Sequence, residues 1–145
     1  FFILKYDPLR DFTFHPEESI SVEGGTGPYV QYAHARICSV FEKYGKKLPE
    51  TADLTPLTQT EEQNIIRMLA QFPQVVDSAA QNYKPLLIAR YLLDLSQLFN
   101  NFYHQHPILT ADEDTMNARL FLLSSVKQVL QNGLSLLSIE APEKM

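Results

Sequence analysis

The segment that follows Pro28 repeats apolar side chains at helical spacing. Apolar residues recur every three or four positions, at Val30, Ala33, Ile37, Phe41 and Tyr44. A proline suits the first turn of a helix because its missing N–H would have no partner there. Gly45 is a typical stop, since glycine readily adopts the left-handed conformation that ends many helices. We therefore predict a helix over residues 28–44 whose apolar stripe faces the core.

A second set of side chains on this helix points away from the core. At about 100° per residue, aromatic, basic and polar positions gather a third of a turn or more from the apolar stripe. They are Tyr29, Tyr32, Arg36, Ser39 and Lys43. One helix therefore combines a buried face with an aromatic and cationic face, which we interpret as a recognition surface.

Two further helices are predicted after a connection that has turn residues and no periodicity. The run Thr60-Glu-Glu-Gln63 fits a capping box, in which two side chains satisfy unpaired backbone donors at a helix start. It predicts a helix over residues 60–72. Because proline disrupts a helix interior, Pro73 is expected to end this helix and to restart the chain in a short one that ends near Asn82.

The carboxyl-terminal half is predicted to form two long helices and a short one. Pro85 suits a first helical turn, and a broad apolar face continues from it for about five turns. The acids of residues 112–114 favour the positive end of a second helix, for which Gly133 provides a stop. A last short helix is predicted over residues 134–139. The chain is expected to be an all-α bundle of about five helices.

The first 27 residues are predicted to be a short extended and loop segment. Residues 1–6 and 12–14 are brief apolar runs that could pair as two small strands, although such runs are also compatible with a helix end. Residues 16–19 suit one helical turn. Residues 20–27 form a loop whose three glycines permit backbone angles that other residues resist, so this loop can adapt to a ligand.

Length and composition limit the class of protein. The chain has 145 residues, 45% of them hydrophobic, which suffices for one main domain with a core. A single cysteine excludes an internal disulfide, and no apolar run reaches the roughly 18 to 20 residues of a membrane span. We expect a soluble, cytoplasmic monomer with no membrane partner. The first residue is Phe1 and not Met, which suggests a piece of a longer polypeptide.

The charge distribution singles out the helix over residues 28–44. The formal net charge is −5, which argues against a protein that coats nucleic acid through bulk electrostatics. Residues 29–47 nevertheless carry four basic side chains against Glu42 alone. They are Arg36, Lys43, Lys46 and Lys47. An anionic partner is therefore expected to meet the protein here.

Candidate catalytic and metal-binding groups are sparse. His34 and Cys38 stand four apart on one helical face, a spacing that two metal ligands could use, but further ligands are missing. The glycines of residues 24–27 precede a helix as in phosphate-binding loops, yet the Gly-Lys-Ser/Thr ending is absent. We predict no metal site and no catalytic residue in this chain, and we interpret the glycines as a hinge.

The sequence GGTGPYVQYAHAR at residues 24–36 closely resembles a characteristic stretch of arginyl-tRNA synthetases. In that family the stretch leads from the catalytic part into the helical anticodon-binding domain, called the DALR domain. Further matches follow the same order along the chain. They are FHPEES at 14–19, FNNFY at 99–103, NARL at 117–120, VLQNGL at 129–134 and IEAPEKM at 139–145. The resemblance covers essentially the whole chain.

This resemblance implies that the chain is a piece of a class I ligase that uses ATP, with Mg²⁺, to activate arginine and transfer it to its tRNA. The family's adenylate-binding signatures, an HIGH-type sequence and a KMSKS-type loop, do not occur here. Residues 28–145 would be the DALR-type domain, and residues 1–27 the trailing end of the catalytic region with a flexible loop. We expect the piece alone to be inactive and to need no cofactor.

The resemblance also implies roles for individual residues. The family's anticodon contacts match Tyr29, Tyr32, Arg36, Tyr103 and Met145. Its flexible, tRNA-responsive loop matches Ser21, Val22, Glu23, Gly24, Gly25 and Thr26. Possible phosphate contacts are Lys43, Lys46 and Lys47. Such groups suit single-stranded RNA, whose splayed bases stack on aromatic or guanidinium planes. The implied partners are arginine tRNA and the catalytic domain of the same polypeptide, and not DNA.

From the residues alone, other interpretations stay open. The tyrosines could pack against a neighbouring helix, and the cations could form a solvated face. The face that carries Tyr29, Tyr32 and Arg36 could also bind another protein, which would make the chain a helical protein-interaction module. An independent hydrolase has almost no support in the sequence.

Overall fold

The computed structural model describes residues 1–7, 16–21, 24–48 and 50–145, and within these ranges every regular element is helical. The elements are the 3-10 helix η1 (Ile3–Lys5), α1 (Pro16–Ser19), α2 (Gly27–Tyr44), α3 (Thr60–Gln81), α4 (Leu86–Gln105) and α5 (Glu113–Leu136). The predicted all-α class is confirmed. In the described ranges, four long helices and the single turn α1 replace the expected five or so helices.

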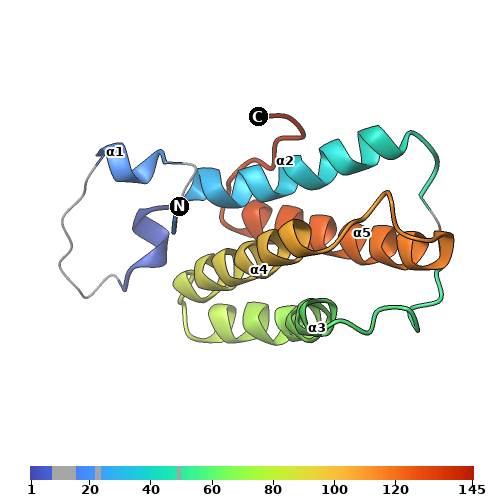
Figure 1. Cartoon of the computed structure of the whole chain (residues 1–145). Coiled ribbons are helices and arrows are strands. Elements are labelled where there is room, and N and C mark those ends of the chain that lie inside the picture. Colours follow the sequence, from blue (N-terminus) through green and yellow to red (C-terminus); the bar gives the residue numbers. More distant parts are fainter. Residues whose placement is uncertain (8–15, 22–23, 49) are drawn as a thin grey trace.

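Helix α4 is the centre of the bundle. It packs against α2, α3, α5 and η1, and Figure 1 shows it between α2 and α3. Its apolar face is completely buried at Leu92, Leu95, Phe99 and Phe102. Burial of side chains of this size contributes about 1.5–3 kcal/mol each. Because α2 lies directly against this helix, polar residues at the edge of α4 meet the exposed face of α2.

Helix α2 begins and ends as its sequence predicts. The Thr26 hydroxyl accepts a hydrogen bond from the Tyr29 N–H, Pro28 lies in the first turn, and Gly45 ends the helix with φ 65°. The apolar stripe is buried at Val30, Ala33 and Ile37, and Phe41 and Tyr44 pack partly against the core. The prediction of a helix with one face in the core is confirmed.

Helix α3 continues through Pro73, where the sequence predicted a break. A proline inside a helix removes one backbone hydrogen bond and crowds the preceding turn, at a cost of about 3 kcal/mol or more. Burial on both sides of the proline offsets this cost, since Ile65 and Ala79 both lie in the core. Figure 1 shows that α3 bends along its length. The short helix predicted after Pro73 is therefore the second half of α3.

The start of α3 differs by one residue from the predicted capping box. Gln59 is the N-cap residue, and its N–H donates to the Glu62 carboxylate over 2.9 Å. Glu62 also pairs with Arg119 of α5, with 2.7 Å between Oε1 and Nε, and both side chains are buried. Because this buried pair holds Glu62 at the helix start, Glu62 takes the capping role that the sequence assigned to Gln63.

Helix α5 passes through Gly133, which the sequence predicted as a stop, and ends at Leu136. The separate helix predicted over residues 134–139 does not form. Packing requires the glycine, because a Cβ atom at position 133 would lie 2.6 Å from Cδ2 of Leu92. Gly133 thus allows α5 to approach α4 closely, and Leu134 beyond it is fully buried.

The amino-terminal segment is helical where the sequence favoured a small strand. Residues 3–5 form η1, and the Lys5 N–H donates to the Phe1 carbonyl. No strand occurs in the described ranges, so this short run satisfies its backbone locally and packs Phe1 and Leu4 against the core. The second run, residues 12–14, lies outside the described residues. The turn predicted at residues 16–19 is confirmed as α1.

Candidate nucleic-acid interface

Arg36 lies between two tyrosine rings on the exposed side of α2. Its Cζ atom is 4.6 Å from the ring centroid of Tyr32 and 5.0 Å from that of Tyr103. Tyr32 stands one turn earlier on α2, whereas Tyr103 comes from the end of α4. A cation this close to an aromatic ring is attracted by the ring quadrupole. Two helices thus build one group of two aromatics and a guanidinium, which we call the Arg36 cluster.

Asn100 of α4 and the Tyr32 hydroxyl hold the guanidinium in place. Nη1 of Arg36 donates to Oδ1 of Asn100 over 2.8 Å, and Nη2 donates to the Tyr32 hydroxyl over 3.1 Å. Asn100 is only 8% exposed, so the surrounding protein restrains it. A guanidinium has five N–H donors, and these bonds use two. The other donors have no partner in the described part of the chain and can serve a ligand.

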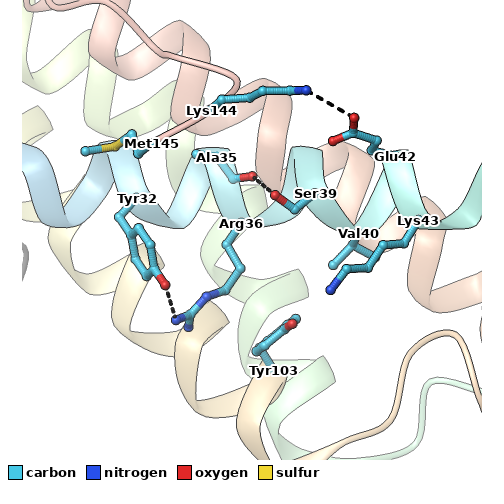
Figure 2. Close-up of a pocket in the computed structure, with 10 residues that line it drawn as sticks. All are labelled: Tyr32, Ala35, Arg36, Ser39, Val40, Glu42, Lys43, Tyr103, Lys144 and Met145. Atoms are coloured by element: carbon cyan, nitrogen blue, oxygen red, sulfur yellow. Dashed lines mark hydrogen bonds and ion pairs between the residues drawn. The ribbon is translucent and has the colours of Figure 1, made fainter.

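Two open hollows flank the Arg36 cluster and share Tyr32 and Arg36. The first, drawn in Figure 2, has a volume of about 450 Å³. We call it the Lys43 hollow, and it is also lined by Lys43, Tyr103, Lys144 and Met145. The second has a volume of about 550 Å³. We call it the Tyr29 hollow, and it is also lined by Gly24, Tyr29, Gln97, Asn100 and His104.

Tyr29 stands at the edge of the second hollow through a contact with α4. Its hydroxyl donates to Oε1 of Gln97 over 3.1 Å, and Nε2 of Gln97 donates to Oδ1 of Asn101 over 2.9 Å. Tyr29 therefore contacts the neighbouring helix α4 with its hydroxyl at the surface, as the packing alternative also expects, whereas Tyr32 is exposed. Both line the hollows with ring surface that is partly open to solvent.

The C-terminal segment, residues 138–145, crosses α2 and completes the Lys43 hollow. Lys144 pairs with Glu42 of α2 over 3.1 Å, and Figure 2 shows Met145 on the side of Tyr32 that faces away from Arg36. Met145 is 60% exposed. The structure thus brings four of the five predicted anticodon contacts to one hollow, namely Tyr32, Arg36, Tyr103 and Met145, and places Tyr29 in the adjoining one.

The charges at the Lys43 hollow favour an anion. Arg36, Lys43 and Lys144 stand against Glu42, the one acid among the residues that line it. Glu42 is already paired with Lys144 at the protein surface. Arg36 and Lys43 therefore contribute positive charge that is not paired with an acidic side chain of the hollow.

Of the three lysines predicted as phosphate contacts, Lys43 alone lines one of these two hollows. Lys46 lies 6.0 Å from the ring centroid of Tyr44, and Lys47 pairs with Glu50 in the connection after α2. Exposed ion pairs contribute only about 0–1 kcal/mol, so Lys47 could exchange Glu50 for a phosphate at little cost. These two lysines extend the basic surface beyond the end of α2.

The described part of the loop over residues 21–26 is attached to the start of α2. The Thr26 hydroxyl donates to the Ser21 carbonyl, and Nζ of Lys5 donates to the Gly25 carbonyl over 2.7 Å. Gly24 has φ 79°, a conformation that favours glycine, and it lines the Tyr29 hollow. Val22 and Glu23 lie outside the described residues. The loop therefore reaches the site through Gly24.

His34 and Cys38 lie close together, with 3.9 Å between Sγ and Nδ1. Nδ1 of His34 is 2.8 Å from the Pro142 carbonyl, which can only accept, so this nitrogen carries the proton. Burial lowers the pKa of His34 and raises the pKa of the Cys38 thiol. In the described ranges, no three His, Cys, Asp or Glu side chains gather as metal ligands would. No helix of these ranges is long and apolar enough to cross a bilayer.

Sequence reasoning missed Gln97, Asn100 and Lys144 as parts of the site. A signal existed for Asn100, because two adjacent asparagines stand inside a long helix, where asparagine is less favourable than alanine or leucine. The partner of Asn100 could not be predicted, since it is 64 residues away in sequence.

Known proteins resemble the chain over almost its whole length. The family model of the DALR anticodon binding domain matches residues 30–145. The arginine–tRNA ligase of Alkaliphilus metalliredigens is 44% identical over 98% of this chain and 25% of its own length. That of Thermococcus kodakarensis is 44% identical over 99% of this chain and 23% of its own length.

Solved structures agree with the sequence relatives. The arginyl-tRNA synthetase of Thermus thermophilus superposes with a TM-score of 0.89 at 38% identity, covering 97% of this chain and 25% of that protein. The enzyme of Plasmodium falciparum gives a TM-score of 0.82 at 28% identity, covering 99% of this chain and 26% of that protein. The chain spans about a quarter of the length of these relatives.

Proposed function

The chain belongs to the DALR anticodon-binding domain family, and on this premise we propose that it binds the anticodon stem and loop of arginine tRNA for an arginine–tRNA ligase. The observation that carries the proposal is the Arg36 cluster, in which a guanidinium with free donors lies between two tyrosine rings and two open hollows. This arrangement supports recognition of unpaired bases, which stack on flat side chains and accept hydrogen bonds.

The geometry of the two hollows supports a role for each residue in this proposal. Tyr29 and Tyr32 offer ring surfaces to splayed bases, and each stacked base typically contributes about 1–3 kcal/mol. Arg36 donates to a phosphate or to a base edge in a charge-assisted bond. Tyr103 and Met145 form the walls of the Lys43 hollow, and Lys43 neutralises a phosphate there. The loop over residues 21–26 adjusts at the Tyr29 hollow when RNA enters.

Catalysis is assigned to the rest of the longer polypeptide. Residues 1–27 would be the end of the catalytic region, and residues 28–145 would be the tRNA-holding domain. ATP, with Mg²⁺, would bind in the catalytic domain, and the whole ligase would act as a cytoplasmic monomer. The chain by itself is then expected to catalyse no arginine-dependent exchange of pyrophosphate into ATP. Measuring this exchange directly detects the activation step.

The function is tested by binding of a fluorescent anticodon stem-loop of arginine tRNA, followed by anisotropy at several salt concentrations. Affinity should fall as salt rises, because phosphate contacts release counterions. It should fall further when the middle anticodon base is changed in an otherwise identical stem-loop. If the affinity changes neither with salt concentration nor with the middle anticodon base, RNA recognition is rejected. The protein-interaction module is then the better hypothesis.

A further inference from the structure

The C-terminal segment reaches the site without any helix of its own. Residues 138–145 follow α5, and Ser138 has φ 58°, which turns the chain out of the helix direction. Ile139 and Ala141 pack partly against the core, whereas Lys144 and Met145 are exposed. The position of the last two residues therefore depends on what holds the backbone just before them.

Two side chains of α2 hold that backbone. Nε2 of Gln31 donates to the Glu140 carbonyl over 2.7 Å, and Nδ1 of His34 donates to the Pro142 carbonyl over 2.8 Å. Residues three apart on a helix lie on one face. One face of α2 therefore holds two carbonyls that stand two residues apart in the segment.

The environment of His34 indicates that the hydrogen bond to Pro142, and not core packing, favours a histidine at this position. His34 is 1% exposed, and its other ring nitrogen, Nε2, is buried with no partner in the described part of the chain. An unsatisfied buried polar atom is unfavourable, so a leucine would suit the core better if packing alone were required. The ion pairs of the segment, from Lys144 and Glu143, lie at the surface and are exposed on at least one side.

We infer that His34 is a positioning residue for RNA binding: through the Pro142 carbonyl it sets where Lys144 and Met145 stand at the Lys43 hollow. His34 contacts no ligand itself, because it lies on the buried side of α2 and lines neither hollow. The inference rests on the proposed function for its effect on affinity. Its structural half, the placement of Met145, is independent of RNA.

Two substitutions of equal shape separate hydrogen bonding from packing. Asparagine and leucine have the same branched outline, and the asparagine Nδ2 is attached to Cγ, as Nδ1 of histidine is. His34→Asn can therefore still donate to Pro142, whereas His34→Leu cannot. Gln31→Leu removes the second hydrogen bond, from Gln31 to the Glu140 carbonyl, at a less buried position. It serves as the test if His34→Leu fails to fold.

The position of Met145 can be read without RNA. The chain has three methionines, so methyl-labelled methionine gives three NMR signals. We expect the Met145 signal to differ from that of a free chain end in the wild type and in His34→Asn, because Met145 then lies at the Lys43 hollow. In His34→Leu it should move to the position of a free chain end. An unchanged Met145 signal in His34→Leu and in Gln31→Leu would overturn the inference.

Binding of the anticodon stem-loop then tests the effect on the site. His34→Leu should weaken binding by about two- to tenfold, the range expected for one hydrogen bond, and His34→Asn should bind like the wild type. In a chain that lacks Lys144 and Met145, His34→Leu should cause no additional loss. An equal additional loss there would show that His34 acts through the fold, which contradicts the inference. If the wild type binds no RNA while the Met145 signal still changes in His34→Leu, the proposed function fails and the positioning role stands.

Discussion

Asn100 holds Arg36 through a hydrogen bond of 2.8 Å that joins α4 to α2. The asparagine is buried, whereas the arginine is half-buried and keeps donors at the surface. A residue on one helix thus decides the orientation of the cation that another helix presents. Because the bond involves a charged donor, it is expected to be stronger than a neutral one.

Asn100→Leu should weaken binding of the anticodon stem-loop by about three- to tenfold, because Arg36 loses its acceptor and becomes free to rotate. The loss is limited because water can solvate the released guanidinium. Anisotropy titration measures the effect. In an Arg36→Ala background the same substitution should add nothing, since it acts through Arg36. Additive losses would mean that Asn100 contacts the RNA on its own.

Tyr32→Ala should reduce affinity for the stem-loop by about fivefold or more, which corresponds to the loss of one stacked base. Circular dichroism should show unchanged helicity, since the Tyr32 ring lies at the surface of the Lys43 hollow. Tyr83→Ala is a matched control, because Tyr83 is 91% exposed and lies in the connection between α3 and α4. Equal losses for the two variants would contradict the assigned site.

Gly133→Ala should destabilise the fold by about 1–3 kcal/mol, because the new methyl group would overlap Leu92. At an exposed helix position the same change would stabilise by about 1 kcal/mol, since alanine favours the helix. Urea unfolding measures the difference. Leu92→Val removes the overlapping Cδ atoms, so the double variant should lose less stability than the two single losses summed. Full additivity would show that the two positions are not in contact.

The stability of the wild type should fall as pH drops below about 6.5, the ordinary pKa of histidine. Burial is the largest effect and lowers the pKa of His34, the hydrogen bond to the Pro142 carbonyl opposes it, and Lys127 and Glu143 have smaller effects of opposite sign. In acid, His34 therefore binds a proton more readily in the unfolded chain than in the folded chain, and unfolding is favoured. Urea unfolding at pH 7.5 and 5.5 should show a larger loss for the wild type than for His34→Asn. The other histidines are common to both proteins, so parallel losses would contradict this role of His34.

The helix that carries the site was accessible from the sequence because its determinants are local. A repeat of 3.6 residues distinguished Val30 and Ile37 from Tyr32 and Arg36. Pro28 and Gly45 indicated where the helix begins and stops. The predicted faces were confirmed for these reasons. The same reasoning failed at Pro73 and Gly133, where local preference favours a helix end and burial of α3 and α5 against the core outweighs it.

Sequence by itself therefore determined an all-α chain with one aromatic and cationic helix face. The tertiary structure decided how that face is completed. Asn100 reaches Arg36 across 64 residues, and Pro142 reaches His34 across 108. Contacts between such distant positions depend on how helices cross and how closely they pack, which no local periodicity encodes. The orientation of the guanidinium and the place of Met145 follow from packing, and with them the shape of the candidate RNA site.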